Sequence, residues 1–371
     1  MNVTEKRHIV FGLPSLLVGG IEKHLIQQLS HYNQEKYRFS VITIFDYPGR
    51  KDLYGFVPKN VDIYKLNFKG YFDFKNTYLL YKILKKIKPD IVVTSMFSAS
   101  AIFRILKLFL RYKIIVREHN TYTDKTKIHF FVDRILSLIT DRVVAVSESV
   151  KKYVSEKSHI SLPKITVIQN GIDIERVNKF IKNNNRDELR KKFGFGFSDK
   201  IILNVARLKP QKNHKLLIDS FVIANKIDPF LKLVILGDGS EKSTLLKYVA
   251  DHKYPNIYLL GYCENVYDYY YISDIFSLTS DREGFPNVCI EALAFGLPVV
   301  STNVPGVDEL IVNGDNGFIV ERNEKDVSDK ILLIASKIPN ISEMQKKCKN
   351  TAESFSLEKN IVKYEKLFDS I

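Results

Sequence analysis

The sequence predicts an α/β protein with two doubly wound, Rossmann-like domains, each built on a mostly parallel sheet. With 371 residues the chain is too long for one ordinary hydrophobic core. Short apolar runs typical of buried strands alternate with amphipathic stretches typical of helices. A polar stretch around Asn183-Asn184-Asn185 interrupts this alternation and is interpreted as an interdomain linker. We therefore expect domains over residues 1–182 and 183–355, followed by a last amphipathic helix over 356–371.

The first half is read as strand–helix pairs. Strands are expected over residues 8–13, 37–45, 61–66, 90–95, 113–117, 142–146 and 165–168, and helices over 21–30, 77–88, 98–111, 128–139 and 147–155. Ser147 is a suitable N-cap for the last of these helices. Gly19 and Gly20 precede the first helix, and their bare backbone allows N–H groups to approach a phosphate, although an ordinary turn explains the pair equally well.

The second half continues the alternation. Strands are expected over residues 200–206, 231–236, 257–261, 274–278, 297–301 and 314–320. A helix is expected from Pro286, at its first position, to Phe295, with Gly296 closing it. Glu283 and Glu291 flank the start of this helix, where a strand ends and where open α/β sheets bind ligands. The helix N-terminus has free N–H groups and a positive dipole end that suit a phosphate.

Two cations follow the first strand of the second half. Arg207 and Lys212 share one loop at the carboxyl end of that strand. Two cations at that edge can neutralise a diphosphate, and arginine can do so bidentately. The alternative is a surface loop with ordinary charges.

The charge of the chain is uneven. Residues 1–182 carry 31 lysines and arginines against 16 acidic residues, whereas residues 183–371 carry 25 against 26. A basic half implies an anionic partner, which is a membrane surface, a phosphate-bearing substrate or a nucleic acid. Arg104, Lys107 and Arg111 recur at helical spacing and form either a solvated basic face or a patch for anionic lipid.

Other features narrow the class of protein. We find no apolar run long enough to cross a membrane, and the N-terminus does not read as a signal peptide. The three cysteines have no metal or redox spacing, which favours a cytoplasmic protein with reduced thiols. No nucleic-acid-binding motif is recognised, so we expect no nucleic-acid partner.

The string that begins at Leu278 resembles the Glu-x7-Glu segment of family-4 retaining glycosyltransferases, which have the GT-B fold. It reads Glu-Gly-Phe-Pro-Asn-Val from Glu283 to Val288, and then Glu-Ala-Leu-Ala-Phe-Gly-Leu-Pro-Val-Val-Ser from Glu291 to Ser301. Further resemblances are Gly19-Gly20, His119 after a strand, Asn-Gly-Ile-Asp over 170–173, Arg207 to Asn213, and Gly237-Asp238-Gly239. Ala206 departs from the glycine that is usual there.

The resemblance implies two domains facing a cleft, with the last helix packing back on the first domain. It also implies roles. Glu283 contacts hydroxyls of the transferred sugar, Glu291 binds the ribose, and Arg207 and Lys212 stabilise the leaving diphosphate. His119 lies near the transferred sugar, although a lone histidine is often structural. The remaining expected donor contacts are Gly19, Gly20, Gly237, Tyr262, Gly284, Phe285, Pro286, Asn287 and Val288.

The predicted function is therefore a retaining glycosyltransferase that needs no metal and no cofactor. It would use a nucleoside diphosphate sugar, with UDP favoured and GDP-mannose open. The acceptor would be a lipid-linked or nascent surface saccharide on the inner face of an anionic membrane. Two other classes stay in view, a basic nucleic-acid-binding protein and an inactive nucleotide-binding scaffold.

Overall fold

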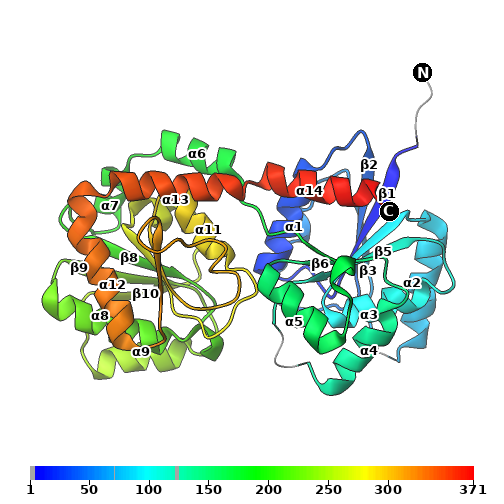
Figure 1. The fold of residues 1–371 in the computed structure, drawn as a ribbon, viewed down its shortest axis with the longest axis horizontal. Coiled ribbons are helices and arrows are strands. Elements are labelled where there is room, and N and C mark those ends of the chain that lie inside the picture. The colour runs from blue at the N-terminus through cyan, green and yellow to red at the C-terminus, as the bar shows by residue number, and fades with distance from the viewer. Residues whose placement is uncertain (1–4, 71, 122–124) are drawn as a thin grey trace. The chain divides into compact units, whose positions relative to one another are not determined.

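The computed structural model describes residues 5–70, 72–121 and 125–371, which form two compact units (Figure 1). Unit 1 contains the chain up to Asn170 together with Leu357–Ile371, and unit 2 contains Gly171–Ser356. The first division therefore falls before residue 171, not after 182 as the sequence suggested. The sequence analysis predicted that the N-terminus is not a signal peptide. The first four residues concerned lie outside the described ranges.

Unit 1 is built on a parallel sheet. Within the described residues this sheet has seven strands in the order β3-β2-β1-β4-β5-β6-β7. The order reverses direction between β1 and β4, and neighbouring strands pair in parallel. The strands are β1 (Arg7–Leu13), β2 (Tyr37–Thr43), β3 (Asp62–Lys65), β4 (Ile91–Ser95), β5 (Lys113–Glu118), β6 (Arg142–Ala145) and β7 (Ile165–Val167).

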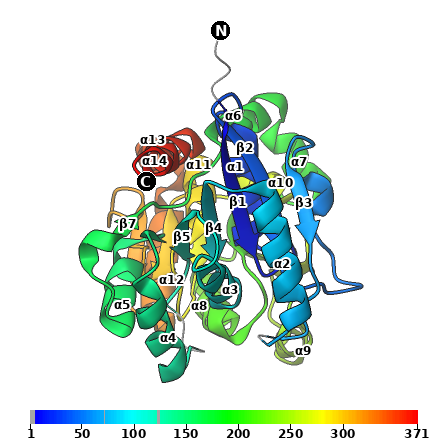
Figure 2. The same ribbon diagram turned by 90° about the vertical axis from the view of Figure 1, so that its right-hand side faces the viewer.

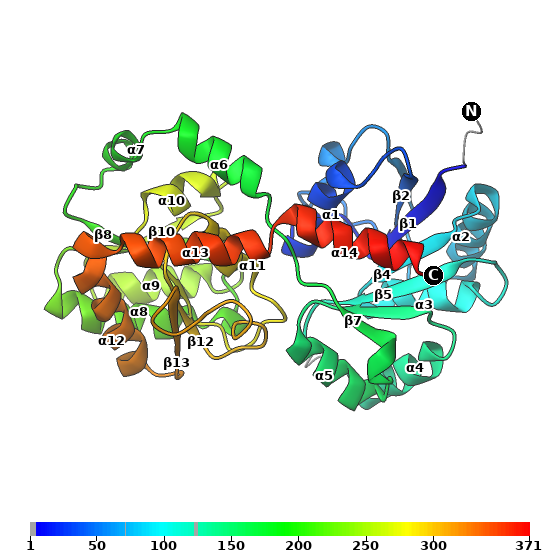
Figure 3. The same ribbon diagram turned by 45° about the horizontal axis from the view of Figure 1, so that its top comes forward.

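Helices cover both faces of this sheet because alternate strand residues point to opposite sides. Ile9 and Phe11 of β1 join the core formed with α1 and α14, whereas Val10 joins the core formed with α2 and α3. Figure 3 shows α1 and α14 on one side and α3, α4 and α5 on the other. The helices are α1 (Gly20–His31), α2 (Phe74–Ile87), α3 (Phe97–Leu106), α4 (Lys127–Ser137), α5 (Glu148–Ser158) and α14 (Leu357–Asp369).

Unit 2 repeats the plan with a six-stranded parallel sheet, counted over the residues described, in the order β10-β9-β8-β11-β12-β13. Its direction reverses between β8 and β11. The strands are β8 (Lys200–Val205), β9 (Leu231–Leu236), β10 (Ile257–Gly261), β11 (Ile275–Leu278), β12 (Val299–Thr302) and β13 (Gly317–Val320). Helix α8 packs on α12, and α11 packs on α13. The helices are α6 (Ile174–Asn183), α7 (Arg186–Lys192), α8 (His214–Ile227), α9 (Lys242–Asp251), α10 (Val266–Ile272), α11 (Asn287–Ala294), α12 (Glu324–Lys337) and α13 (Ser342–Ser354).

The prediction that the polar stretch around residues 183–185 is an interdomain linker is wrong, because this stretch belongs to unit 2. Its polar residues form α6 and α7, which begin at N-caps provided by Asp173 and Asn185. Arg190 of α7 is buried and donates to Asp274 at 2.6 Å, so the charges of this stretch anchor it to unit 2.

The start of α11 also differs from the prediction. Pro286 is the N-cap, and the helix begins at Asn287. Gly296 follows the helix with a positive φ of 80°, as expected of a residue that closes a helix. Ser147, the predicted N-cap of α5, does accept from the Val150 N–H at 3.1 Å.

The predicted basic face on α3 is wrong as well. Arg104 is buried and pairs with Asp133, while Lys107 pairs with Asp141. The helix ends at Leu106, so Arg111 lies beyond it. Asp133 and Asp141 thus neutralise Arg104 and Lys107, and the three predicted residues do not form one basic face of a helix. No helix in the described part of the chain is long and apolar enough to cross a bilayer.

Candidate functional site

The candidate site in unit 2 lies where its sheet changes direction. Strands β8 and β11 are hydrogen-bonded neighbours, and the chain leaves them toward opposite edges of the sheet. The loop after β8 carries Arg207 and Lys212, and the loop after β11 carries Glu283. Ligands of open α/β proteins bind in the crevice outside the carboxyl ends of such strands. The structure therefore brings two predicted site residues to one position, Lys212 and Glu283.

Lys212 and Glu283 contact each other directly. The Lys212 Nζ donates to Glu283 Oε1 at 2.5 Å, and the Ser280 hydroxyl donates to the same oxygen at 2.6 Å. The two charged side chains are 20% and 12% exposed, so their interaction is partly shielded from water. The pair places a cation and an oriented carboxylate side by side, which suits a ligand that combines a phosphate with a sugar.

Backbone contacts hold the two loops together. Asp281 N donates to Gln211 O at 2.8 Å, and the Gln211 side chain donates to Arg282 O at 2.7 Å. The Thr302 hydroxyl at the end of β12 donates to Ser280 O at 2.7 Å. These bonds fix both ends of the Lys212–Glu283 pair on the rigid sheet.

Arg207 lies in the same loop as Lys212 but behaves differently. Its side chain is exposed and makes no ion pair with the residues described. A guanidinium that is not used internally remains available to a ligand, in contrast to the buried Arg104 and Arg190. Nearby, burial and the Lys212 charge lower the pKa of His214 to about 4, so that imidazole is neutral at neutral pH.

Glu291 lies on α11 and contacts a tyrosine. The hydroxyl of Tyr270, a buried residue of α10, donates to Glu291 Oε2 at 2.8 Å. Burial and the neighbouring Glu291 carboxylate raise the pKa of Tyr270 well above its usual value, so the hydroxyl keeps its proton. Tyr270 therefore orients Glu291.

The segment from Gly284 to Val288 leads into α11. Gly284, Phe285 and Pro286 are buried, and Asn287 and Val288 are partly exposed in the first turn. Gly306 packs against this segment: a Cβ at Gly306 would lie 2.8 Å from Gly284 O, and its φ of 80° also favours glycine. The segment is thus shaped by close backbone packing, and α11 begins at Asn287, four residues after Glu283.

Gly237 and Tyr262 follow the two strands on the other side of β8. A Cβ on Gly237 would lie 1.8 Å from Ala206 O, so glycine is required there by a close approach of two backbones. Tyr262 follows β10 and is 46% exposed. The structure places both at the carboxyl edge of the sheet, and it accounts for Gly237 by packing.

The predicted residues of unit 1 lie at its own point of strand reversal. Gly19 is the N-cap of α1 and Gly20 its first residue, after β1. His119 follows β5, and its Nε2 lies 3.2 Å from Ser95 Oγ at the end of β4. Burial, reinforced by the charge of Arg117, lowers the pKa of His119 well below its usual value, so the ring is neutral. Its buried Nδ1 has no hydrogen-bond partner among the described residues.

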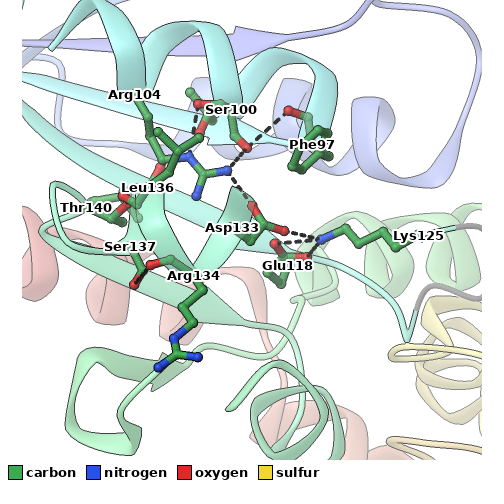
Figure 4. Close-up of polar contacts among 12 residues, drawn as sticks. Phe97, Ser100, Arg104, Glu118, Lys125, Asp133, Arg134, Leu136, Ser137 and Thr140 are labelled. Atoms are coloured by element: carbon green, nitrogen blue, oxygen red, sulfur yellow. Dashed lines mark hydrogen bonds and ion pairs between the residues drawn. The ribbon is translucent and has the colours of Figure 1, made fainter. Parts of the chain in front are cut away.

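A buried ionic cluster includes Glu118, the residue that precedes His119 in the sequence (Figure 4). Lys125 Nζ lies 3.3 Å from Glu118 Oε1 and 3.0 Å from Asp133 Oδ2, and Asp133 also accepts from Arg104 at 2.5 Å. Burial raises the pKa of Glu118, which Lys125 partly opposes. Burial disfavours the charged form of Lys125, yet the two carboxylates together raise its pKa. The cluster ties the end of β5 to α3 and α4.

Sequence reasoning missed Ser280, Tyr270 and this cluster. Ser280 lies three residues before Glu283, and that short spacing was an available signal. Tyr270 and Asp133 contact their partners across long stretches of sequence, so no local pattern reveals them.

Comparisons with known proteins agree with this geometry. The family model described as Glycosyl transferases group 1 matches residues 185–355, and the model described as Glycosyltransferase Family 4 matches residues 18–176. The O-antigen biosynthesis glycosyltransferase WbnH of Escherichia coli is 32% identical over 268 residues, which are 71% of this chain and 72% of that protein. The UDP-Gal:alpha-D-GlcNAc-diphosphoundecaprenol alpha-1,3-galactosyltransferase of Escherichia coli is 27% identical over 95% of this chain and 94% of its own length.

Solved structures share the whole fold. A glycosyltransferase from Rickettsia africae ESF-5 matches with a TM-score of 0.85 and 23% identity, covering 99% of both chains. Anabaena Alr3699/HepE, solved in complex with UDP, matches with a TM-score of 0.81 and 17% identity, covering 98% of this chain and all of that one. The predicted fold class, two Rossmann-like domains of the GT-B type, is confirmed.

Proposed function

Because this chain belongs to the family-4 glycosyltransferases, we propose that it moves a sugar from a UDP-sugar to a lipid-linked saccharide, with retention of configuration and without a metal ion. The transferred group is a hexosyl or N-acetylhexosaminyl residue, and the product belongs to a cell-surface polysaccharide. The observation that carries the proposal is the Lys212–Glu283 pair at the strand reversal of unit 2.

The names of the relatives support the choice of donor and acceptor. One is a galactosyltransferase that uses UDP-Gal and a diphosphoundecaprenol-linked sugar, and another acts in O-antigen biosynthesis. A structural neighbour was solved with UDP-glucose. These properties belong to those proteins, and they favour a UDP donor and a lipid-linked acceptor here.

In this proposal the donor lies outside the carboxyl ends of β8 and β11. The bond between the anomeric carbon and the diphosphate oxygen breaks as charge grows on the diphosphate. Lys212, Arg207 and the α11 N-terminus stabilise that charge from fixed positions, which is the most effective form of electrostatic catalysis. The acceptor oxygen bonds to the same face of the anomeric carbon, and its proton passes to the leaving phosphate.

The carboxylates have different tasks. Glu283 already accepts two hydrogen bonds through Oε1, which leaves Oε2 to accept from a sugar hydroxyl. Glu291, oriented by Tyr270, accepts from the ribose hydroxyls. Gly237, Tyr262 and the segment from Gly284 to Val288 complete the nucleotide pocket.

Unit 1 provides the acceptor side. Its strand reversal presents Gly19, Gly20 and the neutral imidazole of His119, whose unpartnered Nδ1 suits a hydrogen bond to a sugar hydroxyl. A lipid-linked acceptor places the enzyme at the inner face of the membrane as a peripheral protein of the cytoplasm.

Two measurements test the function. A thermal-shift series with UDP, GDP and their sugars should give the largest rise in melting temperature with UDP compounds, because stabilisation grows with ligand concentration over Kd. Sugar transfer from UDP-galactose, UDP-glucose or an N-acetylated UDP-sugar to a diphosphate-linked lipid acceptor should follow, and it should survive an excess of chelator. Stabilisation by GDP compounds in place of UDP would overturn the donor assignment, and nucleotide binding without turnover of any donor would favour an inactive scaffold.

A further inference from the structure

Helix α4 of unit 1 exposes a row of apolar side chains to water. The residues it buries are polar, Asp133 and Ser137. Its exposed apolar residues are Ile128, Phe131, Ile135 and Leu138, which are 73%, 61%, 50% and 81% exposed. Their spacing places them on one face of the helix and its C-terminal end. An amphipathic helix normally buries its apolar side, whereas this stripe of α4 is exposed.

The buried charges explain why α4 has this orientation. Figure 4 shows Asp133 pointing into the cluster with Arg104 and Lys125. Breaking such a buried pair is strongly unfavourable because the remaining charge lacks compensation. This cost prevents α4 from rotating to bury its apolar stripe. The buried ion pairs of Asp133 therefore keep the stripe exposed.

A basic groove runs beside the stripe, between α4 and α5. Its volume is about 600 Å³, and the described residues that line it are cationic, histidine and aromatic: Lys125, Lys127, Phe130, Phe131, Arg134, Tyr153, Lys157 and His159. Lys127, Arg134 and Lys157 are exposed and have no acidic partner within the described ranges. Figure 4 shows the Arg134 guanidinium directed away from the buried cluster.

The neighbouring end of α3 adds further apolar surface. Lys107 Nζ donates to Ile139 O at 2.7 Å, which holds the end of α3 against the end of α4. Leu108 and Phe109 follow α3 and are 64% and 70% exposed. Figure 2 shows α3 and α4 together at one end of unit 1.

We propose that this face, comprising the α4 stripe and the α4–α5 groove, docks on the surface of an anionic phospholipid bilayer. The apolar stripe enters the boundary between headgroups and acyl chains, and the three free cations contact lipid phosphates. A second copy of this chain is the poorer occupant, because a symmetric contact would bring the same uncompensated cations together. The proposal deepens the proposed function and rests on it for the membrane-bound acceptor.

Charge removal tests the groove. The variant Lys127→Ala/Arg134→Ala/Lys157→Ala should bind phosphatidylglycerol vesicles on the order of 100-fold more weakly than the wild type, since three cations lose their lipid contacts. The matched control is Lys82→Ala/Lys85→Ala/Lys86→Ala, which removes the same charge from exposed positions on α2. In flotation assays the control should bind nearly as well as the wild type. Equal losses in the two variants would show a general charge effect and overturn the proposed surface.

Fluorescence tests the stripe. The sequence contains no tryptophan, so Phe131→Trp gives a single reporter on α4, and Phe74→Trp gives a matched reporter that is 78% exposed at the start of α2 in the parent. With phosphatidylglycerol vesicles, the emission of the α4 reporter should shift to the blue and be quenched by brominated acyl chains, whereas the α2 reporter should keep its emission. A reporter at position 131 that ignores vesicles would refute insertion.

The same proteins separate this proposal from the proposed function. The groove variant should retain its UDP-induced rise in melting temperature and its transfer to a water-soluble acceptor analogue, because the donor residues are in unit 2. Flotation that depends on the groove, without any sugar transfer, would support the docking surface and defeat the proposed function. Sugar transfer without groove-dependent flotation would support the proposed function and defeat the docking surface. If inorganic phosphate binds to the groove but vesicles do not, the groove is a site for a free anion, and the docking surface is refuted.

Discussion

Replacing Glu283 by glutamine tests the pair on which the proposed function depends. Glutamine keeps the size of the side chain but removes the negative charge that Lys212 Nζ contacts at 2.5 Å and that the Ser280 hydroxyl contacts at 2.6 Å. A hydrogen bond to a charged group contributes about 1.5–3 kcal/mol, and about 1.4 kcal/mol corresponds to one decade in rate. We therefore expect turnover to fall by about 10- to 150-fold.

Nucleotide binding should respond much less. Glu283 is assigned to the sugar, so the Kd for UDP should stay within about threefold of the wild type, a change below about 0.7 kcal/mol. Initial rates with a UDP-sugar and isothermal titration with UDP measure the two effects separately. This difference between turnover and affinity distinguishes a contact with the sugar from a contact with the nucleotide.

Asp281→Asn is the matched control. Asp281 lies in the same loop, but it is 43% exposed and its ion pair with Arg322 spans 3.4 Å. Exposed pairs of this kind contribute about 0–1 kcal/mol, so the control should turn over nearly as fast as the wild type. The reasoning fails if Glu283→Gln keeps wild-type turnover, or if it loses UDP affinity in proportion to its activity.

Three further predictions concern unit 2. Glu291→Ala should weaken UDP binding by about 1.5–3 kcal/mol through loss of a charged acceptor, and Tyr270→Phe should weaken it less; unchanged UDP titrations would remove the ribose assignment. Arg207→Ala should lower turnover on the order of 100-fold, as for loss of one transition-state donor, while excess chelator leaves the wild type active; an enzyme silenced by chelator and restored by manganese would contradict this. The pKa of His214 is lowered from 6.5 to about 4, so below pH 6.5 the unfolded chain binds a proton that the folded chain refuses. The free energy of unfolding should fall by up to about 3 kcal/mol between pH 7 and pH 4, and His214→Gln should reduce this dependence in urea titrations; an unchanged dependence would assign it to other groups.

Local pattern was sufficient for the strands and for assigning Lys212 and Glu283 to loops that follow strands. The predicted bounds of β9 and β10 agree with the structure because apolar runs there end at glycine or polar residues. The predicted order of strands and loops was enough to place Lys212 and Glu283 after the carboxyl ends of strands. Their direct bond required knowledge that β8 and β11 are neighbours, which sequence order does not reveal.

The errors have a common physical origin. Arg104 was assigned to an exposed basic face from its helical spacing with Lys107 and Arg111, but Asp133, 29 positions further along the chain, compensates its charge in the interior. The stretch after Asp173 was interpreted as a linker from its polarity, yet its aromatic residue Phe180 packs against Tyr267 and Phe295. In both places a partner distant in sequence determines the environment of the residue, and local sequence pattern alone could not identify that partner.

Helix α14 has a consequence for the synthesis of the protein. It supplies Leu357, Ile361, Tyr364 and Phe368 to the core of unit 1, although almost all other residues of that unit are translated before unit 2. On the ribosome, unit 1 therefore waits with an open hydrophobic face until Leu357–Asp369 emerges, whereas the sequence of unit 2 has already been translated. A nascent chain that stops before Leu357 would leave this face uncovered, and quality control would encounter it as an unfinished domain even though its catalytic sequence had been fully translated.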